Sequence, residues 1–220
     1  MSSSSSSSSA SASTTASSLS SLETHDSLPL TSRSRSKAEK AWVDPASLPH
    51  HGHASYIAGN TPDYVKQLNY NTFMCYGVGE EDCFGYKVGK AVKFTDVNVN
   101  RKMERQGRLE ATTTAEIEVT RQMLNGAGML HGGCVAYLID NTPLVVLGLL
   151  QNVNGVGVTQ SMNVLFHSPA PQGSILQIIS TSIALGGRVM SSRCEIIDKD
   201  TGRVIASAFL SKMQPAMSKL

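Results

Sequence analysis

The sequence predicts an α+β domain in which an antiparallel sheet wraps around one long apolar helix. Residues 91–120 alternate apolar and polar side chains, residues 129–150 form one apolar run, and the alternation returns from residue 155 to residue 210. Alternation with a period of two is typical of half-exposed strands, whereas an apolar run of this length indicates a buried helix. The order of strands, helix and strands therefore favours one helix packed on a sheet.

Two strands are expected before the helix and three or four after it. Glycine and proline clusters separate the later segments, and the clearest is Asp198-Lys199-Asp200-Thr201-Gly202, a good hairpin turn. The expected strands span residues 92–99, 107–120, 155–167, 174–184, 189–197 and 204–210.

The N-terminal third of the chain predicts less structure. Residues 2–9 are all serine, and serine, threonine and alanine dominate to residue 21, a composition that is typical of disorder. A loop follows, and Thr61-Pro62-Asp63 is a fair start for a short helix that runs to about Cys75. We therefore expect a disordered Ser-rich tail and loop over 1–59, an N-terminal helix and linker over 60–90, and the folded domain over 91–214.

The same tail bears on localisation without deciding it. Its serine content and the later Arg33, Arg35 and Lys37 resemble a mitochondrial transit peptide, while Glu23 and Asp26 argue against one. A cytoplasmic or a mitochondrial location therefore stays open.

Composition excludes several classes of function. A net charge of +2 and 5% aromatic residues offer neither the electrostatics nor the stacking surfaces of a nucleic-acid-binding protein. The four cysteines contain no CxxC pair, and the histidines at 50, 51 and 53 have no second cluster of ligands, so no metal site is expected. Polar residues and Pro143 interrupt the apolar run, which makes a membrane span unfavourable.

One histidine and one acid in the apolar run suggest a site shared between subunits. His131 and Asp140 are nine residues apart, which on a helix places them on opposite faces and about 13 Å apart along the axis. One copy of the helix cannot direct both side chains at one atom. Two copies related by a two-fold axis can, because each then presents different residues to the other.

Three segments, in this order, resemble the hotdog-fold acyl-CoA thioesterases of the PaaI-like type. They are Asn125-Gly126-Ala127-Gly128-Met129-Leu130-His131-Gly132-Gly133 followed by Asp140-Asn141, then Gly157-Val158-Thr159-Gln160-Ser161-Met162-Asn163-Val164, then Ser168-Pro169-Ala170. The resemblance runs from about residue 92 to residue 212. It implies a helix wrapped by an antiparallel sheet, a homodimer or homotetramer, and hydrolysis of an acyl-CoA thioester to a carboxylic acid and CoA. Coenzyme A is then part of the substrate, and no cofactor is expected.

The resemblance assigns catalytic roles to five residues. The backbone N–H of Gly132, at the amino end of the helix, would stabilise the oxyanion of a tetrahedral intermediate. Asp140, the one charge on the apolar segment, would act as general base or nucleophile, and partial desolvation would raise its basicity. The alternative interpretation is that Asp140 is a buried carboxylate with a structural role, capping the break before Pro143. Asn125 and His131 would orient the thioester, and Thr159, where many relatives have serine, would hold the attacking water.

Pro143 and the substrate contacts complete the expectations. Pro143 should kink the helix because it removes an N–H three residues after the acid. Gly133 and Asn141 are expected to contact substrate, and Arg188 is expected to contact a CoA phosphate, although a solvated surface charge is the plainer reading. Two alternatives stay open: a non-catalytic hotdog protein that binds acyl-CoA or a fatty acyl group, and a hotdog hydratase, whose Asp and His pair has a different spacing.

Overall fold

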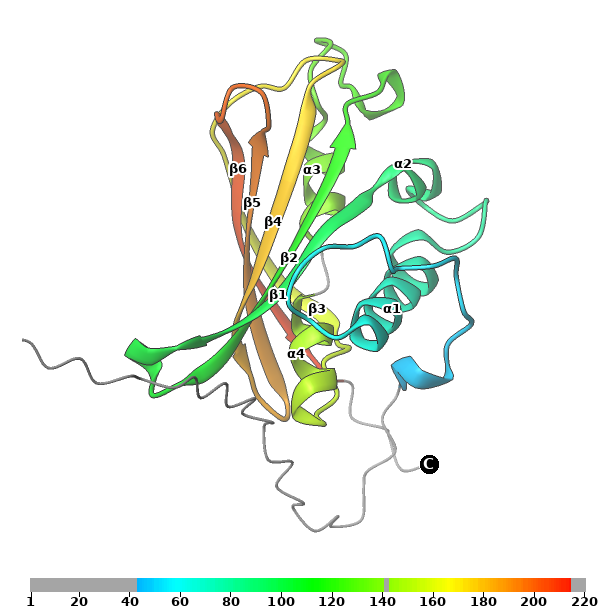
Figure 1. Cartoon of the computed structure of the whole chain (residues 1–220). Helices are drawn as coiled ribbons and strands as arrows, with labels where there is room; N and C mark the ends of the chain where they lie inside the picture. Colours follow the sequence, from blue (N-terminus) through cyan, green and yellow to red (C-terminus); the bar gives the residue numbers. More distant parts are fainter. Residues whose placement is uncertain (1–42, 141–142, 215–220) are drawn as a thin grey trace, which may run out of the picture. The chain divides into compact units, whose positions relative to one another are not determined.

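The computed structural model describes residues 43–140 and 143–214 of the chain (Figure 1). The contacts divide the chain into residues 1–38 and 39–220, and every described residue belongs to the second unit. The Ser-rich tail and Asn141 lie outside the described residues.

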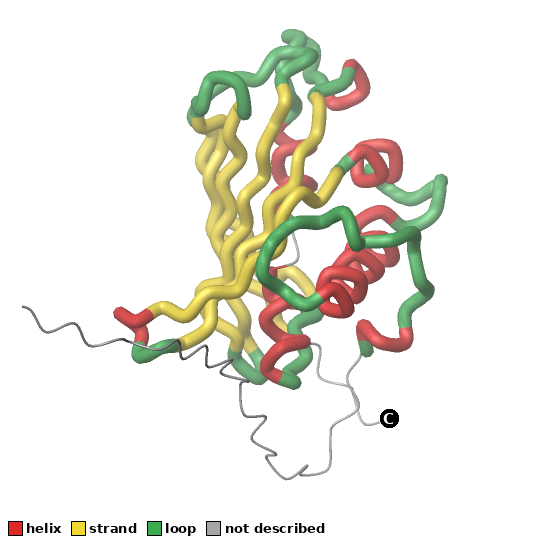
Figure 2. Tube along the Cα trace, viewed as in Figure 1, coloured by secondary structure: helices red, strands yellow, loops and turns green. Residues whose placement is uncertain are grey.

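A single antiparallel sheet forms the body of the domain, as the alternating segments predict. Its six strands are hydrogen-bonded in the order β1-β2-β4-β5-β6-β3. Figure 2 shows the α-helices on one side of this curved sheet. The strands are β1 (Lys93–Lys102), β2 (Arg108–Glu118), β3 (Val158–Phe166), β4 (Ile175–Leu185), β5 (Val189–Asp198) and β6 (Val204–Met213).

The position of β3 differs from a simple meander. Strands β4, β5 and β6 follow one another as hairpins, but β3 pairs with β6 at the far edge of the sheet. The cause is the helical segment between β2 and β3, which crosses the sheet face and delivers the chain to the opposite edge. Strand β4 then takes the place beside β2. One edge of β3 is therefore left without a partner strand among the described residues.

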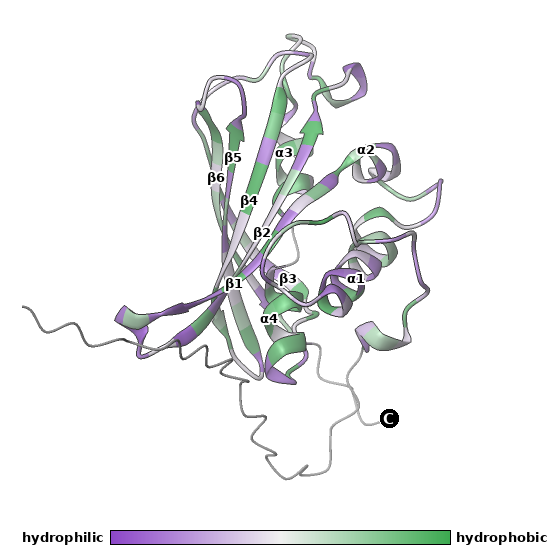
Figure 3. Ribbon diagram, in the orientation of Figure 1, coloured by the Kyte–Doolittle hydropathy of each residue, from purple (hydrophilic) through white to green (hydrophobic). Residues whose placement is uncertain are grey.

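The apolar run forms two helices rather than one, α3 (Gly132–Ile139) and α4 (Pro143–Gln151). Pro143 begins α4, where a missing N–H costs no helical hydrogen bond. By length and composition alone, the stretch Gly132–Gln151 could cross a membrane, but 56% of its most apolar 18-residue window is buried inside the domain. In Figure 3, α4 is largely hydrophobic and lies against the sheet, as a core helix does.

A second layer comes from the chain before the sheet. Helix α1 (Asp63–Thr72) begins two residues after Thr61 and continues as the π-helix η2 (Phe73–Val78), which the sequence did not predict. Helix α2 (Tyr86–Ala91) occupies the expected linker. The rings of Phe73 and Phe94 meet edge to face at 5.1 Å and join η2 to β1. Short 3-10 turns are η1 (Pro45–Ser47), η3 (Met103–Arg105) and η4 (Arg121–Met123).

Residues 43–59, expected to be part of a tail and loop, already belong to the packed unit. Ala54 and Ile57 are buried in the main core, and Val43 packs in a smaller cluster with Val145. The backbone of Ala58 exchanges hydrogen bonds with β1. We therefore expect the chain to lose stability if it is shortened to begin at Asn60, because buried apolar surface would be lost.

Candidate functional site

Asp140 is the central residue of the candidate site and lies at the carboxyl end of α3. The Thr159 hydroxyl donates a hydrogen bond to Asp140 Oδ2 at 2.8 Å, and Lys212 Nζ forms an ion pair with Asp140 Oδ1 at 2.5 Å. The Asp140 side chain is 40% exposed and that of Lys212 14% exposed. Both carboxylate oxygens are thus oriented, and the carboxylate still reaches solvent.

The pairing of β3 with β6 assembles this cluster. Thr159 and Lys212 are directly opposite each other across the two strands, at the end of the sheet next to Asp140. Opposite residues on antiparallel strands present their side chains to the same face of the sheet. Sequence reasoning expected Thr159 but missed Lys212, because the register that brings residue 212 to residue 159 is not encoded locally.

The amino end of α3 carries a different set of groups. His131 caps the helix, and its Nδ1 accepts a hydrogen bond from the Gly133 N–H at 2.8 Å. In the described part of the chain, no group accepts a hydrogen bond from the Gly132 N–H. A Cβ added to Gly132 would lie 3.4 Å from the ring of Phe166, at the far end of β3 from Thr159. The free amide at a helix amino end is suited to an oxyanion.

Asn125 builds the loop that precedes α3. Its Oδ1 accepts hydrogen bonds from the backbone N–H groups of Ala127 at 2.9 Å and Met129 at 3.2 Å. Its backbone N–H also donates to the Met129 carbonyl at 2.7 Å. This carboxamide therefore fixes a turn, and its contacts within one chain do not reach Asp140.

A cavity of about 810 Å³ opens next to the Asp140 cluster. Asp140, Thr159, Lys212 and Gly133 contribute to its wall, which brings two of the expected catalytic residues and one expected substrate contact to the same space. Most of the remaining wall is apolar. It includes Phe73, Val78, Leu144, Val145, Val156 and Met162.

Other expected residues are not brought to this cavity by a single chain. His131, Gly132 and Asn125 are absent from its wall. Arg188 lies at the same end of the sheet as Lys212, since its carbonyl accepts a hydrogen bond from the Gln214 N–H at 3.2 Å, but its side chain is exposed and outside the cavity. Asn141, the remaining expected substrate contact, is not described.

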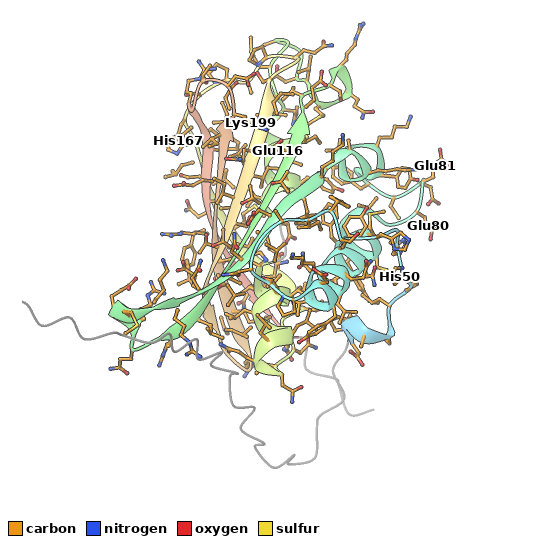
Figure 4. The ribbon with its side chains drawn as sticks, in the orientation of Figure 1. His50, Glu80, Glu81, Glu116, His167 and Lys199 are labelled. Atoms are coloured by element: carbon orange, nitrogen blue, oxygen red, sulfur yellow. The ribbon has the colours of Figure 1, made fainter. Side chains whose placement is uncertain are left out.

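Histidine and cysteine side chains add no metal centre to the described residues. No group of three or more His, Cys, Asp or Glu side chains among them could hold a metal ion. His50, which is labelled in Figure 4, lies in the loop before α1. Its ring meets that of His53 edge to face, with the centroids 6.0 Å apart. Burial raises the pKa of the Cys134 and Cys194 thiols to about 11, as expected for cysteines that fill space in a core.

Comparison with known proteins shows which family this chain resembles. The sequence model of the thioesterase superfamily matches residues 127–205. Human acyl-coenzyme A thioesterase 13 is 32% identical over 91 residues, which is 41% of this chain and 64% of that protein. The chain thus spans less than two thirds of that relative.

Two further similarities extend the match. A putative esterase of Caenorhabditis elegans is 30% identical over 129 residues, which is 55% of this chain and 75% of that protein. The crystal structure of zebrafish thioesterase superfamily member 2 superposes with a TM-score of 0.53 at 20% identity, and covers 66% of this chain and 94% of its own. The shared architecture is the hotdog fold. With residues 127–205 matched by the family model and three quarters of a relative aligned at 30% identity, this chain belongs to the thioesterase superfamily.

Proposed function

We propose that this protein hydrolyses an acyl-CoA thioester to a carboxylic acid and free CoA. The observation that carries the proposal is the Asp140 carboxylate, which Thr159 and Lys212 orient from both sides at the wall of an apolar cavity. Membership of the thioesterase superfamily supports this assignment, and so does the name of the human relative, acyl-coenzyme A thioesterase 13.

In this proposal Asp140 is the general base. It takes a proton from a water molecule as the water oxygen attacks the thioester carbonyl carbon. The carbonyl oxygen becomes an oxyanion, which accepts a hydrogen bond from the Gly132 N–H. The carbon–sulfur bond then breaks, and the CoA thiolate leaves and takes up a proton. A covalent acyl-enzyme in a quenched single turnover would make Asp140 a nucleophile instead.

The two halves of this mechanism come from different copies of the chain. Gly132 and Asp140 lie at opposite ends of α3, about 12 Å apart by the helical rise. Gly132 is beside Phe166 at one end of β3, and Asp140 is beside Thr159 at the other end. If two β3 strands pair antiparallel about a two-fold axis, each end meets the opposite end of its partner. Each Asp140 would then face the partner's helix start.

Strand β3 is suited to such pairing. Its free edge exposes backbone hydrogen-bonding groups, and unpaired sheet edges tend to recruit another strand. Large apolar side chains on β3 are also exposed, with Leu165 at 59% and Phe166 at 61%. Burying them in a dimer would remove this apolar surface from water. The catalytic unit is therefore proposed to be a homodimer.

The reaction is tested with a panel of acyl-CoAs and a thiol-reactive dye. A thioesterase releases free CoA thiol in step with loss of the acyl-CoA. Acyl-CoA binding with no thiol release by the full chain would instead support the non-catalytic binding protein, and water addition to an enoyl group would support a hydratase.

The shared site is tested by mixing two inactive variants. Gly132→Pro removes the N–H but keeps the helix start, because proline is favoured at the first helical position and His131 before it is extended. Mixed with Asp140→Asn, it forms heterodimers with one intact site. Random exchange makes half of the dimers mixed, so about a quarter of the wild-type activity should return. Gly132→Ala keeps the N–H and serves as the matched control. No recovery after verified exchange would contradict a site shared between subunits.

A further inference from the structure

We propose that the segment Thr72–Phe84, which includes the π-helix η2, is the outer wall of a chamber that holds the acyl chain of the substrate and sets its length. The inference rests on the proposed function and deepens it. Nine cavity residues belong to the segment Thr72–Phe84, and all of them fall outside residues 127–205, which the thioesterase superfamily model matches. The wall therefore comes from a part of the chain that lies outside the region matched by the family model.

The opposite wall is one face of α3. Gly133, Ala136, Tyr137 and Asp140 all line the cavity, and their spacing of three, four and seven residues places them on a single helical stripe. The neighbouring Val135, Leu138 and Ile139 are buried in the core instead. The stripe starts at the helix amino end and finishes at the carboxylate, so whatever fills the chamber lies next to the reacting centre.

Tyr137 joins the two walls. Its hydroxyl donates a hydrogen bond to the Gly77 carbonyl in η2, and its ring packs edge to face on Phe84 with the centroids 6.1 Å apart. A Cβ at Gly85 would come within 2.8 Å of the Tyr137 ring, and one at Gly89 within 2.2 Å of its hydroxyl. Glycine at both positions allows α2 to close on Tyr137. These contacts hold the η2 wall at a fixed distance from α3.

The charge of the wall selects the acyl chain over the nucleotide end of CoA. Gly79 and Cys83 line the cavity, and the loop between them carries Glu80, Glu81 and Asp82, all exposed. Figure 4 shows Glu80 and Glu81 on the outer side of this segment. Three carboxylates would repel the phosphates of CoA. Among the described residues, the cavity wall contains one cationic side chain, that of Lys212, and it is already paired with Asp140.

The size of the chamber selects longer acyl chains. Its volume of about 810 Å³ is in the range of cavities that enclose most of a drug-sized ligand, about 300–1,000 Å³. An acetyl group would fill only a small part of this apolar space. Each methylene group added to the acyl chain would move from water into contact with an apolar wall. The burial of one methylene corresponds to about fourfold in binding, so kcat/KM should rise about fourfold per methylene until the chamber is full.

The test is a series of straight-chain acyl-CoAs from two to eighteen carbons, hydrolysed by the full chain. In Ala136→Leu the added side chain fills the chamber beside Asp140, so the ratio of long-chain to short-chain kcat/KM should fall at least tenfold. In Phe84→Ala the rim of the chamber is lost, so the increase of kcat/KM per methylene should become smaller among the longest acyl chains. Tyr64→Ala is the matched control, because Tyr64 is an exposed aromatic residue on the same N-terminal segment that does not line the cavity.

Thiol release that is independent of chain length, or an Ala136→Leu variant that slows all chain lengths equally, would overturn the chamber and leave the thioesterase function intact. If no acyl-CoA is hydrolysed, the proposed function fails. Calorimetry with the same series then still tests the chamber, which predicts that affinity and the negative heat-capacity change of binding grow with chain length. Affinity that is flat across the series would overturn the chamber. If Ala136→Leu does not fold, Phe84→Ala against Tyr64→Ala provides the same comparison.

Discussion

Asp140 accepts a hydrogen bond from the hydroxyl of Thr159 at 2.8 Å, although Asp140 ends a helix and Thr159 is near the start of the sheet's edge strand. The resemblance to thioesterases assigns this hydroxyl to the attacking water. In this structure it orients the carboxylate itself. The side chain on β3 thus fixes the direction in which Asp140 can accept a proton.

Thr159 should tolerate serine but not alanine. Thr159→Ser keeps the donor to Asp140 Oδ2, so the turnover number should stay within about threefold of wild type. Thr159→Ala removes it and frees the carboxylate to rotate, which should lower the turnover number about 10-fold to 100-fold. Steady-state kinetics of both variants on one acyl-CoA check this. Equal turnover numbers for the two variants would show that the Thr159 hydroxyl does not contribute to catalysis.

Lys212 should act as a positioning residue. Lys212→Met keeps the apolar stem and removes the cation that holds Asp140 Oδ1, so kcat should fall about tenfold while KM changes little. Lys212→Arg should restore much of the rate. Because partly exposed ion pairs contribute little to stability, the free energy of unfolding should change by less than about 1 kcal/mol. A rise in KM at constant kcat would place Lys212 in substrate binding instead.

Cysteine reactivity should follow exposure. Cys83 is exposed at the cavity wall, whereas burial raises the pKa of Cys134 and Cys194 to about 11. At pH 7.5 only about one in three thousand of such thiols is ionised, and the thiolate is the reactive form. Iodoacetamide labelling of the native protein, followed by mass spectrometry, should therefore modify Cys83 first. Equal labelling of Cys194 would mean that its strand opens readily.

Acid should weaken the β5–β6 hairpin. The Thr201 N–H and hydroxyl both donate to Asp198 Oδ1 at 2.9 Å, and these hydrogen bonds lower the pKa of Asp198 below its ordinary value. A lowered pKa in the folded state stabilises the fold above the unfolded pKa of about 3.9, and this contribution is lost as the pH falls through the folded pKa. Asp198→Asn should therefore reduce the free energy of unfolding at pH 7, with a difference that shrinks from about pH 5 downward.

Urea unfolding at a series of pH values measures this difference. Asp200→Asn, a charge change at an exposed position of the same turn, is the matched control. A penalty for Asp198→Asn that is constant down to pH 2 would show that ionisation of Asp198 does not contribute.

The strands could be predicted because their signal is local. Alternation over residues 189–197 predicts β5 to within one residue of its observed end at Asp198, and the Asp198–Gly202 turn separates it from β6 as expected. The break of the apolar helix at Pro143 is equally local, since it depends on one missing N–H.

What the sequence could not predict depends on distant pairing. Lys212 joins the site because β3 pairs with β6, and no local pattern selects β6 over β2 as the partner of β3. The π-helix and α2 are set by contacts of Gly77, Gly85 and Gly89 with Tyr137, and glycine by itself disfavours a helix. The segment that forms the chamber wall therefore resembles a linker in sequence, and the wall could not be predicted from it.

Whether Asp140 is the general base is tested by single-turnover hydrolysis of a long-chain acyl-CoA by Asp140→Asn, measured on a variant with the same oligomeric state as wild type. The amide keeps the size of the carboxylate but cannot take a proton from water, so the rate should fall by about two to four orders of magnitude while acyl-CoA binding is largely retained. A variant that hydrolyses the bound acyl-CoA as fast as wild type would contradict Asp140 as the base and the mechanism built on it.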